Sequence, residues 1–183
     1  MKQSWNQTLI TAQGDGTALT AAAAASCLPV ASRLTLPNGF FSAIGDQFRL
    51  IASGRISCAV TTPGTARFDL RLGGIVVFDT LAMNLNIVAK TNVHWLLDVT
   101  CTVRSLGAAA TILSQGLWTS EAVIASPLPT VGGSGVFTVP YNTAPTPGAS
   151  FDSTSALAAD FFFTQTAATG SMTLHQFAIH SQL

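Results

Sequence analysis

Charge is what this sequence has least of. It carries 8 basic and 8 acidic residues among 183, which is 9% with a net charge of zero, whereas a typical soluble domain has about 25%. Without a basic excess the chain has no means of neutralising a phosphate backbone, so we expect no nucleic-acid partner. The 48% content of hydrophobic residue types excludes a disordered chain. A surface with so few charges is poorly soluble alone, which predicts that part of it is buried against other subunits.

Long hydrophobic runs are also lacking. The best runs are Ala21 to Ala25 and Ile75 to Phe78, whereas a membrane-spanning helix needs about 20 apolar residues. The first residues are polar, unlike the continuous apolar stretch of a signal peptide. We therefore expect no membrane segment and no export signal.

The three cysteines, Cys27, Cys58 and Cys101, have no metal-like spacing, and their odd number leaves one unpaired. Cys58 and Cys101 fall in phase with apolar neighbours on strand-like segments, which indicates buried free thiols. Such thiols fit a protein that is made and assembled in a reducing cytoplasm.

Period-two alternation of apolar and polar residues dominates from residue 47 onward. It is most regular where apolar side chains fill one face of residues 48–58, 66–72 and 93–103. The pattern also predicts strands at 75–78, 81–89, 111–119, 136–139, 158–164 and 172–181. Helix signals are weak, because the alanine run at 21–25 is too short for a stable helix.

Strands with one apolar face each must pack as two sheets or a barrel. The sequence therefore predicts an all-β fold, a two-sheet jelly-roll sandwich over residues 31–183, preceded by an extended N-terminal arm over residues 1–30. An immunoglobulin-like sandwich is the alternative. That fold usually has Cys and Trp residues on facing strands, and these are not suitably spaced here.

A series of turn and core motifs carries a resemblance to a known group of proteins. The motifs are, in order, Leu36-Pro37-Asn38-Gly39-Phe40-Phe41, Ala52-Ser53-Gly54-Arg55-Ile56-Ser57, Arg67-Phe68-Asp69-Leu70-Arg71-Leu72-Gly73, Phe151-Asp152-Ser153-Thr154 and Met172-Thr173-Leu174-His175-Gln176-Phe177. Together they resemble small structural proteins of tailed bacteriophages and their prophages, from about Trp5 to Gln182. The resemblance implies a jelly-roll domain that oligomerises on the virion, and it implies no catalytic residues.

Residues with catalytic or metal-binding chemistry are few. His175 and His180 are separated by an odd number, which places them on opposite faces of a regular strand. Glu121 is the only glutamate, and the scattered aspartates do not give the paired carboxylates of a glycosidase. Asp69 and Asp98 alternate with nearby arginines, so we expect cross-strand ion pairs there. We predict no catalytic residue, no metal ligand and no cofactor, and therefore no enzyme.

Four residues are candidates for an oligomer or capsid interface: Trp5, Ile10, Phe162 and Tyr141. Trp5 and Ile10 are apolar residues of the arm, which we expect to lie along a neighbouring subunit or the capsid, with Trp5 in a pocket. Phe162 lies between two other phenylalanines, so its strand has aromatics on both faces, as in a strand buried on both sides. Tyr141 lies in a proline-rich loop. It and Trp118 are also candidates for a sugar platform, although packing is the simpler interpretation of both.

These observations favour a bacteriophage virion structural protein. The leading hypothesis is a capsid decoration or cement protein that forms a homotrimer and stabilises the head. Its partners would be other copies of the same chain and the major capsid protein or other virion proteins. It would be assembled in the host cytoplasm and located in the virion. The alternative is a tail- or fibre-associated protein that uses the same sandwich to bind host-surface carbohydrate.

Overall fold

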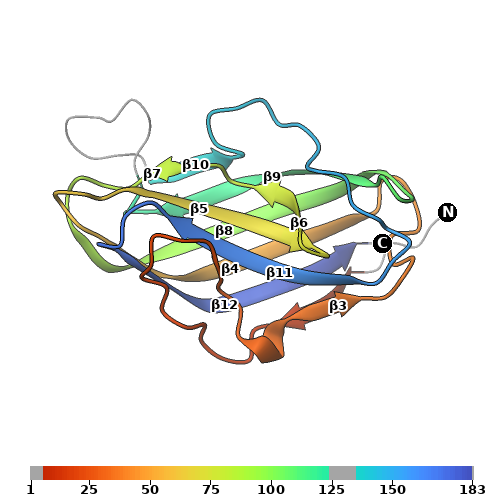
Figure 1. The fold of residues 1–183 in the computed structure, drawn as a ribbon, viewed down its shortest axis with the longest axis horizontal. Coiled ribbons are helices and arrows are strands. Elements are labelled where there is room, and N and C mark those ends of the chain that lie inside the picture. Colours follow the sequence, from red (N-terminus) through yellow and green to blue (C-terminus); the bar gives the residue numbers. More distant parts are fainter. Residues whose placement is uncertain (1–5, 124–134, 183) are drawn as a thin grey trace.

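The computed structural model describes residues 6–123 and 135–182, which form two antiparallel sheets packed face to face (Figure 1). The strands of sheet A are β1 (Asn6–Thr11), β4 (Gln47–Cys58), β8 (Lys90–Ser105), β9 (Thr111–Ser120), β10 (Val136–Val139) and β12 (Ser171–Gln182). The strands of sheet B are β2 (Ala25–Ser26), β3 (Leu34–Leu36), β5 (Thr65–Leu72), β6 (Ile75–Asp79), β7 (Met83–Asn84) and β11 (Leu157–Gln165). A 3-10 turn, η1 (Val30–Ser32), precedes β3.

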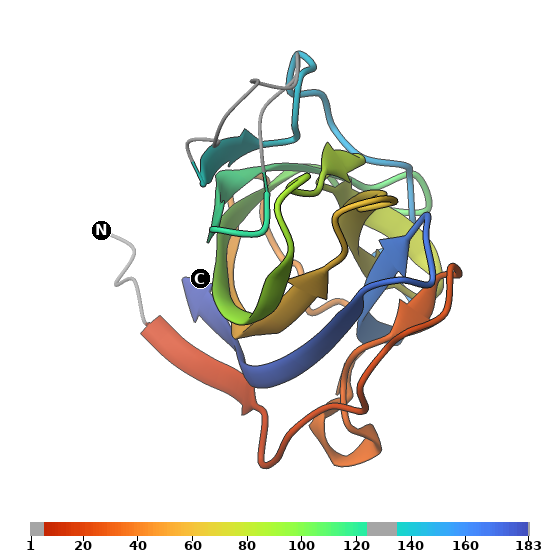
Figure 2. The same cartoon turned by 90° about the vertical axis from the view of Figure 1, so that its left-hand side faces the viewer.

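The strand order is that of a jelly roll. Sheet A runs β1-β12-β4-β8-β9-β10 and sheet B runs β2-β11-β5-β6. The chain crosses between the sheets repeatedly, and the first strand of each sheet lies beside one of the last two, β12 or β11 (Figure 2). That order is the eight-stranded double Greek key, with β9 and β10 added to one edge of sheet A. The prediction of an all-β, two-sheet jelly-roll sandwich is confirmed.

The alternation of the long strands matches the predicted phase. In β4, β5 and β8 the residues predicted to face inward are buried except for the half-buried Val93, and Trp95, Leu97 and Val99 have no exposed surface. Their neighbours on the same strands point to the two outer surfaces, because side chains alternate between the faces of a sheet.

The core is centred on aromatic rings that come from both sheets. Phe68 of β5 contacts Trp95 and Trp118 of sheet A, with ring centroids 4.7 and 5.3 Å apart. On its own sheet Phe68 contacts Phe161 and Phe163, at 5.4 and 5.2 Å. All five rings are fully or almost fully buried, and they tie the two layers together.

One predicted strand is mostly absent. The alternation over 81–89 gives only the two-residue β7, because Leu81 has a positive φ of 61° and the chain then turns at 86–88. Asn86 explains that turn, since its side-chain oxygen accepts a hydrogen bond from the backbone N–H of Val88 at 2.9 Å. Apolar residues recur every second position here because Met83 and Leu85 contact the core from an irregular segment.

The N-terminal segment is extended, and its described part lies along its own sandwich. β1 pairs antiparallel with β12, and Ile10 lies opposite Ile179. Farther along the chain, Leu19 forms an isolated antiparallel β-bridge with Met172, and β2 pairs with β11. Residues 6–30, predicted as an arm that lies on a neighbour, therefore contribute strands to both sheets of the same chain. The apolar side chains of the segment explain this, since Leu9, Ile10 and Leu19 pack against the core.

Candidate functional site

Three of the four predicted interface residues fall in the described part of the chain, and they lie apart in the fold. Trp5 is outside the described residues. Ile10 lies on the outermost strand of sheet A and is half-buried against the core. Phe162 is on the outer surface of sheet B, and Tyr141 follows β10, where its ring meets Phe137 edge-on at 5.6 Å. The structure does not bring Ile10, Phe162 and Tyr141 together into one site.

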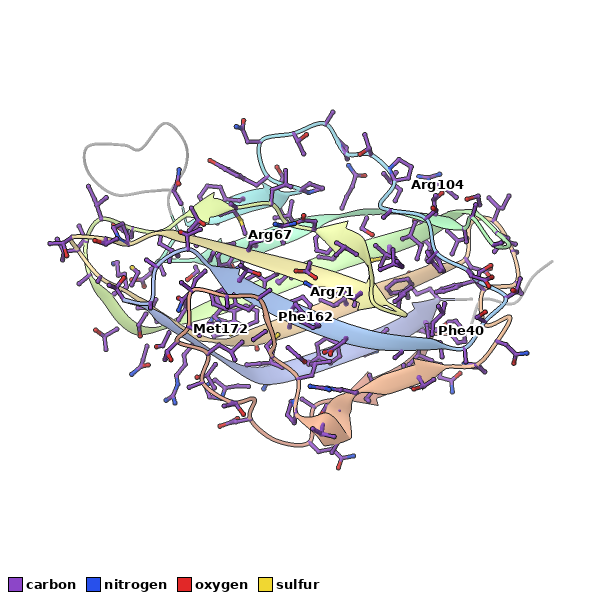
Figure 3. All side chains as sticks on the ribbon, viewed as in Figure 1. Phe40, Arg67, Arg71, Arg104, Phe162 and Met172 are labelled. Atoms are coloured by element: carbon purple, nitrogen blue, oxygen red, sulfur yellow. The ribbon has the colours of Figure 1, made fainter. Side chains whose placement is uncertain are left out.

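The outer surface of sheet B, which we call face B, carries a set of ion pairs. Arg67 pairs with Asp79 of the neighbouring strand, and Arg71 pairs with Asp69 two residues earlier on β5. The Arg71 guanidinium also lies over the ring of Phe162, 3.7 Å from its centroid. Figure 3 shows Arg67, Arg71 and Phe162 on this one surface. The outward ring that we predicted for another subunit is thus partly covered by its own chain.

The outer surface of sheet A, which we call face A, has an apolar centre. Ile51 of β4 and Leu117 of β9 lie in one cross-strand row, on either side of Asp98. Leu96 of β8 and Val136 of β10 share the next row. Leu117 and Val136 are 48% and 52% exposed, although they lie within a sheet face rather than in loops. Ile51 and Leu96 are half-buried.

Neutral polar side chains surround that apolar centre. They include Ser53, Thr100, Gln115, Thr138 and Gln176. One ion pair lies among them, in which Arg49 Nε donates to Asp98 Oδ1 at 2.7 Å and the second nitrogen donates to Asp98 Oδ2. The predicted cross-strand ion pair of Asp98 is therefore present. Its partner is Arg49 of the neighbouring strand and not an arginine close to Asp98 in the sequence. Arg55 of β4 and Arg104 of β8 also point outward from this sheet, so face A combines a few aliphatic side chains with neutral polar and positively charged ones.

Two smaller apolar areas lie at opposite ends of β4. Near its C-terminal end Val60 and Val88 are 57% and 56% exposed, and the thiol of Cys58, the last β4 residue, contacts the Val88 carbonyl at 3.9 Å. At its N-terminal end Ile44 is 68% exposed, and Leu106 follows directly after β8, the strand that pairs with β4 there. Exposed aliphatic side chains are thus found at three separate places on the sandwich.

A small cavity lies between β6 and the loop that follows β10. Its volume is about 210 Å³, and it is lined by Val77, Phe78, Asp79, Leu81, Ser114, Pro140, Thr143, Ala144, Thr146, Pro147 and Gly148. Gly148 is required there, because a Cβ on it would lie 2.1 Å from the carbonyl oxygen of Val77. Trp118, a candidate for a sugar platform, does not reach any surface and belongs to the core.

A bulge in β12 changes the expected orientation of the histidines. Leu174 and Phe177 are both buried although an odd number separates them, because the pairing with β4 slips by one residue between Leu174 and Gln176. His175 and His180 therefore both point away from the core. The prediction that they face opposite sides was wrong, since it assumed a regular strand.

Each of these two histidines has a polar partner. His175 Nδ1 lies 2.8 Å from Asp15 Oδ1, and His180 Nδ1 lies 3.1 Å from Thr8 Oγ1. Within residues 6–123 and 135–182, no group of three or more His, Cys, Asp or Glu side chains is placed to hold a metal ion. The same ranges contain no helix with the length and hydropathy needed to cross a membrane.

Several carboxylates are held by neighbouring side chains. Glu121 Oε2 lies 3.2 Å from Lys90 Nζ, and Asp160 accepts a hydrogen bond from Ser26 Oγ at 2.5 Å. Asp152 accepts hydrogen bonds from the hydroxyl and the backbone N–H of Thr154, and these lower the pKa of its carboxyl. Asp152 is thus a turn-forming residue, as its sequence context predicted.

All three cysteines are free and buried, as predicted for Cys58 and Cys101. Burial raises the pKa of the Cys101 thiol to about 12, because the thiolate would lose its hydration inside the sandwich. Desolvation also raises the pKa of Cys27 and Cys58. These thiols are protonated at neutral pH and behave as small apolar side chains.

Comparison with known proteins gives a weak likeness to a solved structure. No protein family matches the sequence, and no curated protein matches it. A solved structure, the CBM2 module of Lactobacillus casei BL23 phage J-1 evolved Dit, aligns over 100% of this chain and 99% of that chain. The identity is 10% and the TM-score is 0.36. A likeness of this size carries no information on function.

Proposed function

We propose that this chain is a structural subunit of a bacteriophage virion, a capsid decoration or cement protein that assembles as a homotrimer. The observation that carries the proposal is the placement of exposed aliphatic side chains at three separate places, on face A and at both ends of β4. A subunit of a shell needs several contact surfaces, since it touches its own copies and the lattice beneath. The sequence resemblance to phage structural proteins supports the same proposal.

The proposed mechanism is mechanical and has no catalytic step. Each contact removes apolar surface from water, which contributes about 25 cal/mol per Å². A standard interface of about 1,600 Å² involves tens of kcal/mol of gross transfer, most of which is offset by the loss of freedom on association. A trimer then binds the lattice through several such contacts at once, and this avidity makes detachment rare.

A rigid sandwich suits this role. The aromatic contacts of Phe68 with Trp95 and Trp118 link the two sheets, so a force applied to one face is transmitted to the other. The ion pairs of face B are satisfied within the chain, which leaves face A and the two ends as the apolar surfaces for partners. In this proposal the partners are other copies of the chain and the major capsid protein.

The direct test uses phage heads that lack the protein, prepared from a phage whose gene for it is deleted. Purified protein added to these heads should bind them at a fixed stoichiometry and raise the temperature at which they release DNA. A double variant at the two ends of β4, Ile44→Arg with Val60→Arg, should bind less. If heads without the protein are as stable as decorated ones and do not bind it, the decoration role is wrong.

One observation favours the alternative, a tail- or fibre-associated protein that binds host carbohydrate. The cavity beside β6 has room for a single sugar ring, and it offers Asp79, Thr143 and Thr146 among aliphatic walls, close along the chain to Tyr141. Titration with fragments of the host cell wall, followed by NMR, tests this function. Shifts confined to the cavity residues, and lost in Asp79→Asn, would support it over the decoration role.

A further inference from the structure

We infer that the cavity beside β6 binds the terminal ring of a neutral glycan, and that the Ser114 hydroxyl is the buried group that recognises it. The inference rests on the carbohydrate-binding alternative and adds the class of ligand and its recognition group. It begins from Ser114 of β9, which lines the cavity and is only 4% exposed. The Oγ atom of Ser114 has no hydrogen-bond partner within the described part of the chain.

A buried hydroxyl without a partner destabilises a fold, because it has lost its hydrogen bonds to water. The residue opposite Ser114 across the strands is Cys101, whose protonated thiol is a weak hydrogen-bonding group. Alanine would fill the same space without that cost. The serine is therefore explained by a polar occupant of the cavity and not by the packing of the core.

The cavity is formed before any ligand binds, because the loop that covers it is fastened at both ends. The backbone N–H of Tyr141 donates to the carbonyl of Thr80, directly after β6, at 2.9 Å. The N–H of Gly148 donates to the carbonyl of Ile112 in β9 at 2.9 Å. One end of the loop is thus held beside each sheet. A ligand entering such a site pays little for ordering the protein.

The charges of the lining select a neutral ligand. Asp79 is the one charged residue among the described residues that line the cavity, and none of them is Lys, Arg or His. The Asp79 carboxylate is already compensated, since Oδ1 accepts hydrogen bonds from Arg67 Nε and from the Leu81 backbone N–H, both at 2.8 Å, and Oδ2 accepts one from Arg67. A cation gains little there, and an anion would meet the carboxylate without a counter-charge.

The lining also combines the two kinds of surface that a sugar ring presents. Apolar side chains form the walls, namely Val77, Phe78, Leu81, Pro140 and Pro147, and the C–H groups of a pyranose ring pack against such walls.

Hydroxyl partners are provided by Ser114, Thr143 and Thr146. Asp79 adds one acceptor position, because a carboxylate has about four and three are used. The volume of about 210 Å³ is below the range of about 300–1,000 Å³ for drug-sized ligands. The cavity therefore accommodates one ring at the end of a glycan.

The test is NMR titration of the purified full chain with the methyl glycosides of glucose, galactose and mannose, and with that of glucuronic acid as the charged probe. At least one neutral probe should shift the amide signals of Ser114, Thr143 and Thr146. Its Kd should be about 1–10 mM, as expected for a ligand of about a dozen heavy atoms. The glucuronic acid glycoside should bind at least about tenfold more weakly, because its carboxylate would lie near Asp79.

Ser114→Ala separates ligand binding from folding. It removes a hydroxyl that has no partner in the described structure, so the melting temperature should stay the same or rise. The affinity for the neutral probe should fall about fivefold to tenfold, because one hydrogen bond to the ligand is lost.

Ser120→Ala is the matched control, with the same change at a buried serine of the same strand that does not line this cavity. Ser120 Oγ donates to the His94 carbonyl at 3.0 Å. The control should therefore lower the melting temperature and leave sugar binding unchanged.

Three results overturn the inference. No saturable shift with any neutral probe at about 50 mM, well above the millimolar range, would mean that the cavity holds water only. Equal binding of the charged and neutral probes would contradict the neutral class of ligand. Unchanged affinity in Ser114→Ala would contradict the role of its hydroxyl.

The site and the proposed functions fail separately. A protein that binds these probes but not fragments of the host cell wall contradicts the host-binding alternative and leaves the site intact. A protein that binds the probes but not phage heads contradicts the decoration role alone. Decoration of heads without any sugar binding contradicts the site alone.

Discussion

Phe68 of β5 and Trp95 of β8 lie against each other across the interior, with 4.7 Å between their ring centroids. The two residues belong to different sheets, so their contact is one of the places where sheet A is joined to sheet B. Neither side chain has any exposed surface. The stability of the sandwich therefore depends on this pair and on the rings around it.

Replacement of Trp95 by Ala should lower the free energy of unfolding by about 3–5 kcal/mol, as large aromatic deletions do. Urea denaturation measures the loss. Trp95→Phe is the matched variant and should cost less, because it keeps an aromatic ring and removes an indole N–H that has no hydrogen-bond partner in the structure. A loss below about 1 kcal/mol for Trp95→Ala would contradict its central position.

The buried thiols should make the protein less stable in alkali. The pKa of Cys101 rises from 9.0 to about 12 on folding, so the folded chain keeps a proton that the unfolded chain releases. Its contribution is fully present below about pH 9 and is lost as the pH rises towards 12. The free energy of unfolding should fall over that window by up to about 1.4 kcal/mol per pH unit per thiol.

Urea denaturation of the wild type and of Cys101→Ala, at about pH 8 and about pH 10, checks this dependence. The variant should be less stable at the lower pH and should show a shallower decline. Equal declines in the two proteins would mean that Cys101 ionises normally in the folded state.

The turn at Asp152 should titrate abnormally. Its carboxylate accepts hydrogen bonds from the hydroxyl and backbone N–H of Thr154, and these lower its pKa. The stability it contributes is therefore present above the ordinary carboxyl pKa and is lost as the pH falls through the lowered value. NMR titration of Thr154→Val should show the pKa of Asp152 raised towards the ordinary value, and an unchanged pKa would contradict the role of the hydroxyl.

Truncations at the N-terminus separate its two roles. Removal of residues 1–5 leaves β1 in place, so the melting temperature should stay the same, while loss of Trp5 should weaken attachment to phage heads. Removal of residues 1–11 also removes β1, whose Leu9 and Ile10 pack against the core. It should lower the free energy of unfolding by about 1.5–3 kcal/mol, because both side chains are half-buried and full burial of one contributes about 1.5–3 kcal/mol. Equal head binding by the shorter truncation and the full chain would exclude Trp5 as an anchor.

The parts of the fold that the sequence predicted are those set by local alternation. In β8, every second residue from Trp95 to Val103 is buried, as the pattern requires. The pattern failed at 81–89, where alternating apolar residues contact the core from a turn. It also missed the bulge at Leu174, because one extra residue in a strand is set by its pairing with β4 and leaves no mark in composition.

Long-range pairing explains the remaining differences. The sequence predicted that the apolar side chain of Ile10 lies against another surface. It did not predict that Ile10 pairs with Ile179, which is almost the whole chain away. Face A likewise could not be predicted residue by residue. Ile51, Leu96 and Leu117 read as ordinary members of separate strands, and only the register of β4, β8 and β9 places them together.

Electron cryomicroscopy of intact phage particles, at a resolution that shows side chains, tests the central claim most directly. The account predicts this sandwich on the outside of the head, in trimers. Density for the sandwich in the tail or fibres, or its absence from the particle, would contradict the decoration role.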